Sequence, residues 1–296
     1  MRKVVLGLVM ICGASAALAV DKTFDRTFTV KPGGALTVVA DGADISVMGG
    51  DGTQVVVHMV ASASQKDLDE LKLSAEANDA GVLVQMLRPE RNKWFNWSHF
   101  DGRIEVTVPR SYRVDAKTSG GDVHLDSIAG PSRVQTSGGD LKIKDVKGAL
   151  DGHTSGGDVR LESIDGAVKA HTSGGDFYAS GVHGDIEAST SGGDVRLLHI
   201  DGKIRANTSG GGVQCELVGA NRGIWASTSG GDVRLSVPKD ITGTIDAESS
   251  GGSIRSDLPV TTTHVEEHRL SGTINGGGEK IYAHTSGGNI TLSTSK

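Results

Sequence analysis

The sequence predicts an all-β protein: a parallel β-solenoid with about 18 residues and two strands per coil, preceded by an N-terminal β cap with one short helix. Three observations predict this class. The tetrapeptide Thr-Ser-Gly-Gly recurs every 18 residues, beginning at Thr118, Thr136, Thr154, Thr172, Thr190 and Thr208. Apolar and polar residues alternate between the copies, as they do in β-strands. Glycine accounts for 43 of the 296 residues and aromatic residues for only 4%, which suits tight corners and a thin core.

One period, residues 157–174, shows the pattern. Residues 159–162 alternate apolar and charged side chains and predict one strand. Asp165-Gly166 predicts a turn, and residues 168–172 predict a second strand. Ser173-Gly174-Gly175 then predicts the corner that leads into the next coil. Each period therefore predicts two strands and two turns.

The same residue types return at equivalent positions of successive periods. The first strand begins with an apolar residue in each of seven copies: Val123, Leu141, Val159, Phe177, Val195, Val213 and Val233. Coils stacked about 4.8 Å apart would place each residue against its equivalent one period away. An antiparallel meander of 18-residue hairpins remains an alternative. A hexapeptide left-handed helix does not fit, because the residues that follow Leu161 at six-residue intervals are Ala167 and Ser173.

The later copies are less regular. The motif returns at Thr228 and Thr285, with a Ser-Ser-Gly-Gly variant at Ser249. The additional residues fall at 219–223 and 238–240, at the mid-coil turn opposite the Ser-Gly-Gly corner. One edge of the solenoid is therefore expected to tolerate insertions while the other does not.

The domain boundaries follow from where the repeat begins. Residues 111–296 are predicted to form the solenoid and residues 20–110 its N-terminal cap, because an open strand edge would recruit other chains. Within the cap, strands are expected around residues 36–47, 55–57, 82–86 and 104–108, and one short helix is expected over residues 64–77.

Residues 1–19 are predicted to be a secretory signal peptide. Arg2 and Lys3 form a basic start, residues 4–11 an apolar stretch and Ala17-Leu18-Ala19 a small-residue cleavage signal. The mature chain is thus expected in the periplasm, in the medium or at the cell surface.

A net charge of −6 argues against a nucleic-acid partner. Cys215, the one cysteine left after cleavage, is expected to be a buried small hydrophobe.

Polar rows of the repeat offer three candidate chemistries. The aspartates that follow most Gly-Gly corners suggest calcium, but the β-roll motif is only half present, so they are expected to accept N–H groups of the turns. His153 and His171 share an outward row with His284, and surface histidines are favoured over a metal site. A third outward row, the arginine row of Arg160, Arg196, Arg234 and Arg255, could bind an anionic polymer, but the acidic residues beside it favour a solvated face. No catalytic residue, metal ligand or cofactor is predicted.

The segment of residues 94–100 is the one site-like feature. It concentrates aromatic side chains in a chain that has few, and its predicted binding residues are Trp94, Phe95, Trp97, His99 and Phe100. Exposed, the cluster would contact a partner, a glycan or a membrane; folded inward, it would plug the solenoid end. Both interpretations stay open. The candidate partners are an envelope polysaccharide, a membrane surface or another envelope protein.

The sequence also resembles a known bacterial family. The resemblance rests on the opening Phe-Thr-Val-Lys-Pro-Gly-Gly-Ala-Leu of residues 28–36, Val-Thr-Val-Pro of residues 106–109, the Thr-Ser-Gly-Gly-Asp coils and the closing residues 285–292. The chain is similar to secreted or surface domains of unknown function commonly labelled "putative adhesin". This resemblance implies a β-solenoid of the cell envelope with an adhesive or scaffolding role, and it supplies no catalytic residues.

Together these features predict an exported, non-enzymatic protein that acts as an adhesin, an envelope scaffold or a binding protein. One alternative is an envelope-stress or membrane-associated component that binds through the aromatic segment. Another is a polysaccharide-active β-helix enzyme, which would need a cleft with two converging carboxylates between residues 110 and 260.

Overall fold

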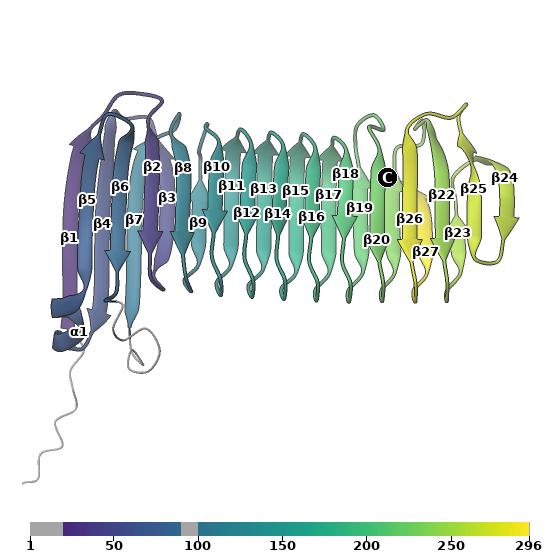
Figure 1. Ribbon diagram of the computed structural model, residues 1–296. Coiled ribbons are helices and arrows are strands. Elements are labelled where there is room, and N and C mark those ends of the chain that lie inside the picture. The colour runs from purple at the N-terminus through teal and green to yellow at the C-terminus, as the bar shows by residue number, and fades with distance from the viewer. Residues whose placement is uncertain (1–19, 90–99, 296) are drawn as a thin grey trace, which may run out of the picture.

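The computed structural model describes residues 20–89 and 100–295, which form an elongated solenoid of two facing β-sheets (Figure 1). Each coil of the repeat contributes one strand to each sheet, and all coil-to-coil pairings between residues 113 and 237 are parallel. The prediction of an all-β parallel solenoid with two strands per coil is confirmed. The antiparallel meander is excluded as the architecture of the repeat.

Sheet 1 has 13 strands, in spatial order β1 (Val20–Thr29), β4 (Gln54–Ala63), β7 (Asp101–Pro109), β3 (Asp44–Gly50), β9 (Val123–Asp126), β11 (Leu141–Lys147), β13 (Val159–Asp165), β15 (Phe177–His183), β17 (Val195–Asp201), β19 (Val213–Leu217), β21 (Val233–Val237), β27 (Ile290–Thr294) and β23 (Ile254–Ser256). Sheet 2 has 14, in the order β24 (Val260–Glu266), β25 (Arg269–Ile274), β22 (Gly243–Ser249), β26 (Lys280–Thr285), β20 (Ile224–Thr228), β18 (Ile204–Asn207), β16 (Ile186–Ser189), β14 (Val168–His171), β12 (Leu150–His153), β10 (Ser132–Gln135), β8 (Arg113–Thr118), β2 (Ala35–Ala40), β6 (Gly81–Leu87) and β5 (Lys72–Asn78).

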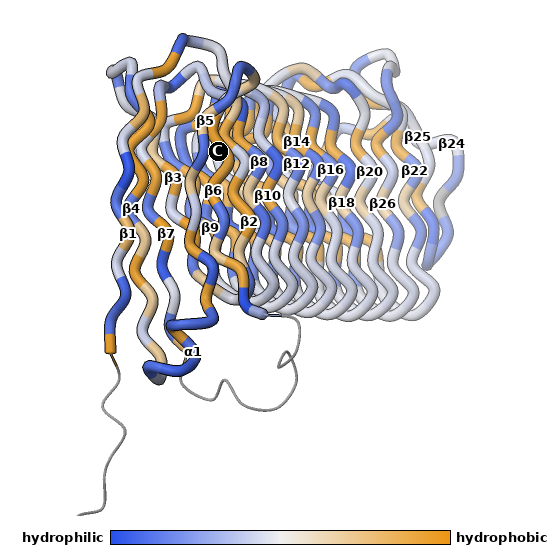
Figure 2. The backbone as a smooth tube through the Cα atoms, turned by 60° about the vertical axis from the view of Figure 1, so that its left-hand side comes forward, coloured by the Kyte–Doolittle hydropathy of each residue, from blue (hydrophilic) through white to orange (hydrophobic). Residues whose placement is uncertain are grey.

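The core is a thin layer between the two sheets. Along each strand, buried apolar residues alternate with residues that face solvent, and the tube of Figure 2 changes colour accordingly. Val159 pairs in register with Leu141 on one side and Phe177 on the other. Buried alanines such as Ala170 and Ala188 occupy sheet 2, and their small size lets the two sheets approach. The apolar rows predicted from the repeat are therefore the rows that pack.

The threonine of each Thr-Ser-Gly-Gly corner joins two coils. Thr154 is fully buried, and its hydroxyl donates to the carbonyl oxygen of Gly139 in the preceding coil, 2.8 Å away. The Thr154 hydroxyl oxygen also accepts the N–H of Gly157, in its own corner, at 3.3 Å. Equivalent hydroxyl-to-carbonyl bonds occur at Thr118, Thr136, Thr172, Thr190, Thr208, Thr228, Ser249 and Thr285. Each buried hydroxyl is thus satisfied as donor, and the bond fixes the register of successive coils.

The aspartate that follows most Gly-Gly pairs forms a second ladder at the same corner. The carboxylate Oδ1 of Asp140 accepts the backbone N–H of Asp158, one coil further on, at 2.8 Å. The pattern continues from Asp44 to Asp194, and Asp232 accepts from Asn289. The expectation that these aspartates accept turn N–H groups is confirmed. A side chain on the second glycine would collide, since a Cβ on Gly157 would lie within 2.1 Å of the Gly139 oxygen.

The coils at both ends are stacked out of sequence order. The coil of β26 and β27 lies between the coil of β20 and β21 and the coil of β22 and β23. At the other end, the coil of β2 and β3 lies between the coil of β8 and β9 and the coil of β6 and β7. The last Thr-Ser-Gly-Gly corner therefore stacks on the corner of Thr228, with the Ser249 corner beyond it. Figure 1 shows the C-terminal coil in this interior place.

Antiparallel strands close the two ends. β4 and β1 extend sheet 1 beyond β7, and β5 pairs with β6. At the far end, β25 and β24 cover the edge of β22. The predicted helix over residues 64–77 was too long: α1 spans Gln65–Glu70, capped by the Ser64 hydroxyl, and residues 72–78 form β5 instead. As a strand, this segment pairs with β6, whose edge a longer helix would leave without hydrogen-bond partners.

The buried threonine provides a direct test of the corner. Thr154→Val keeps the shape but removes the hydroxyl, leaving the Gly139 carbonyl and the Gly157 N–H without their partner. We expect the free energy of unfolding to fall by about 1–3 kcal/mol, measured by urea denaturation. Ser155→Ala, in the exposed neighbouring position, should change it by less than about 0.5 kcal/mol. Equal stability of the two variants would contradict this role of the hydroxyl.

The close approach of the corners can be tested with two adjacent glycines. Gly157→Ala places its Cβ against the Gly139 carbonyl, whereas the nearest atom to a Cβ on Gly156 is 3.4 Å away. We expect Gly157→Ala to destabilise the protein by about 1–3 kcal/mol through overpacking. Gly156→Ala is the matched control and should lower the thermal midpoint far less. Equal thermal midpoints for the two alanine variants would contradict this close approach of successive coils.

Candidate binding surface

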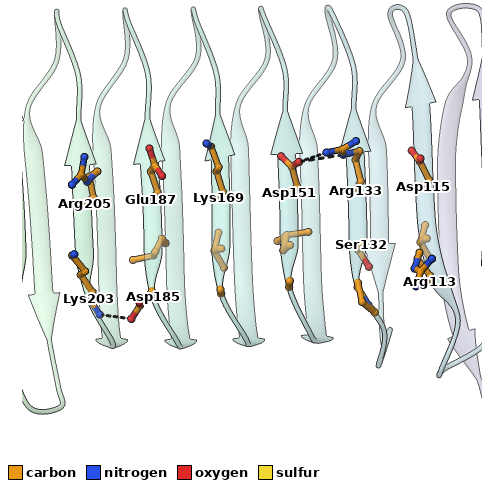
Figure 3. Close-up of a pocket in the computed structure, with 17 residues that line it drawn as sticks. Arg113, Asp115, Ser132, Arg133, Asp151, Lys169, Asp185, Glu187, Lys203 and Arg205 are labelled. Atoms are coloured by element: carbon orange, nitrogen blue, oxygen red, sulfur yellow. Dashed lines mark hydrogen bonds and ion pairs between the residues drawn. The ribbon is translucent and has the colours of Figure 1, made fainter. Parts of the chain in front are cut away.

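The outer face of sheet 2 carries a regular row of charges. One solvent-facing residue from each of six successive strands, β8 to β18, forms the charge row: Asp115, Arg133, Asp151, Lys169, Glu187 and Arg205. The sign alternates at every step (Figure 3). Because the strands are parallel and in register, these side chains stand about 4.8 Å apart along the solenoid.

Few of these charges neutralise one another within the chain. Arg133 binds Asp151 through Nε and Nη2, at 3.1 and 2.9 Å. In the described part of the chain, Asp115, Lys169 and Glu187 form no ion pair. The Arg133–Asp151 pair is about half exposed on both sides, so it contributes about 0–1 kcal/mol. Most of the row is therefore available to a partner.

A shallow hollow of about 710 Å³ lies beside the charge row. It forms because small side chains, Pro131, Ala149 and Ala167, take the outward position at the start of three successive strands. Longer ones, Arg113 and Lys203, line its two ends (Figure 3). The hollow thus combines an apolar strip with a charged wall.

An aromatic pair continues the charge row beyond Arg205. Trp225 is 41% exposed, and its ring stacks on that of Tyr282 with centroids 4.0 Å apart. The Arg205 guanidinium lies 5.9 Å from the Trp225 ring, and Lys280 Nζ lies 5.0 Å from the Tyr282 ring. This pair was not predicted from the sequence. The two residues lie far apart in the sequence, and only the out-of-order stacking of the β26–β27 coil makes them neighbours.

The histidine row also lies on this face. The rings of His153 and His171 stack with centroids 5.4 Å apart, and His171 Nδ1 lies 2.8 Å from the Ser189 hydroxyl oxygen. Partial burial, with a smaller contribution from His153, lowers the pKa of His171 below its usual value. Among residues 20–89 and 100–295, no three or more His, Cys, Asp or Glu side chains are grouped so as to hold a metal ion.

The predicted aromatic binding segment falls mostly outside the described residues. Trp94, Phe95, Trp97 and His99 are in residues 90–99, so their part in binding stays a prediction. Phe100 is described: it is half-buried and packs against the core, with the Arg88 guanidinium 5.0 Å from its ring centroid.

On sheet 1, two members of the arginine row, Arg160 and Arg234, are paired locally. Arg160 binds Glu162 at 2.6 Å and lies over the ring of Tyr178, while Arg234 binds Asp232 at 2.6 Å. These contacts agree with the expectation of a solvated face with largely cancelled charge. Sheet 2 is therefore the better candidate surface.

Fold and surface together define a two-sheet β-solenoid with one regularly charged, exposed sheet face. The chain belongs to the family described as Toastrack DUF4097, whose profile matches residues 35–293. No curated protein matches the chain. The family resemblance predicted from the sequence is thereby confirmed.

Several solved structures are similar to the chain at low identity. A putative adhesin from Bacteroides fragilis is 12% identical, with a TM-score of 0.30, and the alignment covers 93% of this chain and 97% of that one. A putative lipid binding protein from Parabacteroides distasonis is 11% identical, with a TM-score of 0.44 and the same coverage. A putative cell adhesion protein from Clostridium sporogenes is 11% identical, with a TM-score of 0.22, covering 93% and 100%.

Cys215 is a buried core residue, as predicted. It is 1% exposed, and burial raises the pKa of its thiol to about 12. Because the thiolate is the reactive form, we expect no reaction with a disulfide reagent at pH 8 in the folded protein, and complete reaction in denaturant. Ser155→Cys places a second thiol at an exposed corner and should react at once. Labelling of Cys215 at the rate of that exposed thiol would contradict its burial.

Proposed function

We propose that the protein is exported and acts as a non-enzymatic, adhesin-like binding or scaffold protein of the cell envelope. The observation that carries this proposal is the outer face of sheet 2, a long surface on which the charge row, an apolar hollow and the stacked pair of exposed Trp225 and half-buried Tyr282 lie next to one another. Such a surface suits an extended partner more than a small substrate, which requires a concave pocket.

The basis for proposing export is the predicted signal peptide, whose cleavage signal ends at Ala19. Cleavage there would leave every described strand intact. In the part of the chain that the structure describes, no helix is long and apolar enough to cross a membrane.

The arrangement of carboxylates favours binding over hydrolysis. In the charge row, Lys169 stands between Asp151 and Glu187, and the side chains project side by side from a flat sheet (Figure 3). Two-carboxylate hydrolysis needs an acid and a base on either side of one bond. We therefore infer that an envelope polysaccharide would be bound and not cleaved, which an assay for released reducing ends would check.

The binding proposal is tested with the mature chain, residues 20–296. Immobilised peptidoglycan, lipopolysaccharide, anionic liposomes and a glycan array form the panel. We expect one class to bind, and Trp225→Ala to weaken that binding at least tenfold by removing an exposed aromatic contact. Tyr178→Ala, which removes an aromatic side chain from the outer face of sheet 1, is the matched control and should bind as the wild type does.

The aromatic segment of residues 94–100 is tested in the same panel. If it is the contact region, combined Trp94→Ala and Trp97→Ala substitutions will abolish binding while leaving the circular dichroism spectrum unchanged. Absence of binding to every member of the panel, or binding unaffected by both the Trp225 and the Trp94/Trp97 variants, would contradict the proposed recognition surfaces.

A further inference from the structure

We propose that the outer face of sheet 2 binds a second copy of this chain, in a two-fold symmetric, face-to-face dimer. The inference rests on the proposed function only in treating this face as a recognition surface. Its basis is the order of signs along the charge row, which reads negative, positive, negative, positive, negative, positive from β8 to β18.

An alternating row of even length is complementary to its own reversal. A two-fold axis parallel to the strands, between β12 and β14, sets two such faces together and turns the row end for end. Every charge then meets one of opposite sign. Asp115 faces the partner's Arg205, Arg133 faces the partner's Glu187, and Asp151 faces the partner's Lys169. Since a two-fold interface is isologous, each pair occurs twice.

The charge row also selects this arrangement over the other face-to-face one. An axis along the solenoid would keep the row in the same direction and set each charge against its own kind. Like charges placed together across an interface are strongly unfavourable. Complementarity of this type fixes orientation and register more than it adds affinity.

Apolar contacts continue the interface at both ends of the charge row. Beyond Arg205 stand Trp225 and Tyr282; beyond Asp115, at the other end, stand Thr37 on β2 and Leu83 on β6. The same axis brings Trp225 over the partner's Thr37 and Tyr282 over the partner's Leu83. The exposed ring of Trp225 and the half-buried ring of Tyr282 would thereby be covered.

The outward row at the start of the strands, which includes Pro131, Ala149 and Ala167, is mostly compatible with this face-to-face arrangement. Ala149 faces the partner's Ala167 next to the axis, so the apolar hollows of the two copies meet. One like-charge juxtaposition occurs, between Arg113 and the partner's Lys203 at the ends of this row. Ten strands about 4.8 Å apart, with four residues of about 3.3 Å each, give roughly 600 Å² in projection. That area approaches the roughly 800 Å² which each partner buries in a standard interface.

The test exchanges charges that cannot meet within one copy. Arg133 and Glu187 are three strand spacings apart, about 14 Å, but they face each other across the proposed axis. Arg133→Glu alone, or Glu187→Arg alone, sets like charges together in the dimer. The two substitutions combined restore opposite charges between copies, while leaving three acidic residues in succession within each copy.

We expect sedimentation equilibrium of the mature chain, at about 0.1 M salt and without any ligand, to give a dimer. Each single variant should raise the dissociation constant at least tenfold, and the combined variant should return it to within about threefold of the wild type. Arg196→Glu, on the outer face of sheet 1, is the control and should leave it unchanged. Circular dichroism verifies that all variants are folded.

Three results would overturn the proposal: a wild-type chain that stays monomeric, a folded combined variant no better than the single variants, or a dimer whose dissociation constant is the same at 0.05 and 0.5 M salt. Exposed ion pairs weaken with salt, so the last result would place the contact elsewhere. A dimer on this face would cover Trp225, so a ligand bound through Trp225 would compete with dimerisation. A monomeric mass leaves the binding panel unaffected, and a silent panel leaves the mass unaffected, so the two proposals fail separately.

Discussion

The buried hydroxyl at the corner of each coil is the interaction on which the rest of the structure depends. It bonds the carbonyl of the coil before it and the N–H of its own turn, as Thr154 does with Gly139 and Gly157. A hydroxyl in this place has no access to water, so a slip of one residue between coils would leave the donor unsatisfied. The second glycine of the corner admits no side chain, because the preceding carbonyl occupies the space. Hydrogen bonding and close packing thus impose one register.

A fixed register has consequences for the surface. Every outward position becomes a row of side chains about 4.8 Å apart, so that like charges in a row would repel while alternating charges do not. Sheet 2 satisfies this constraint with the alternating charge row, and sheet 1 with ion pairs between adjacent positions of one strand, such as Arg160 and Glu162. Most of the sheet 2 row stays unpaired, whereas on sheet 1 ion pairs neutralise Arg160 and Arg234. The difference between the two faces is the physical basis for placing recognition on sheet 2.

The sequence was informative wherever structure is local and periodic. The strands and corners of residues 118–237, the turn role of the aspartates and the burial of Cys215 all follow from the repeat. The order of coils at the two ends does not, because any coil edge offers the same hydrogen bonds and the period alone cannot say which edge a returning chain will join. For the same reason the stacking of Trp225 on Tyr282 was missed. Residues 64–77 were predicted as one helix because Leu68, Leu71 and Ala75 would share a helix face, but residues 72–78 pair with the neighbouring edge of β6 and form a strand.

Amide hydrogen exchange of the mature chain would show whether the corner hydrogen bonds hold successive coils together. The corners protrude into solvent, yet their N–H groups are bonded to Thr oxygens and to the Asp oxygens of the preceding coil, as at Gly157 and Asp158. The account predicts that these amides exchange as slowly as those within the neighbouring strands, and orders of magnitude more slowly than Lys239 in the exposed turn between β21 and β22. Corner amides that exchanged as fast as Lys239 would contradict it, since the coils would then be held by their strands alone.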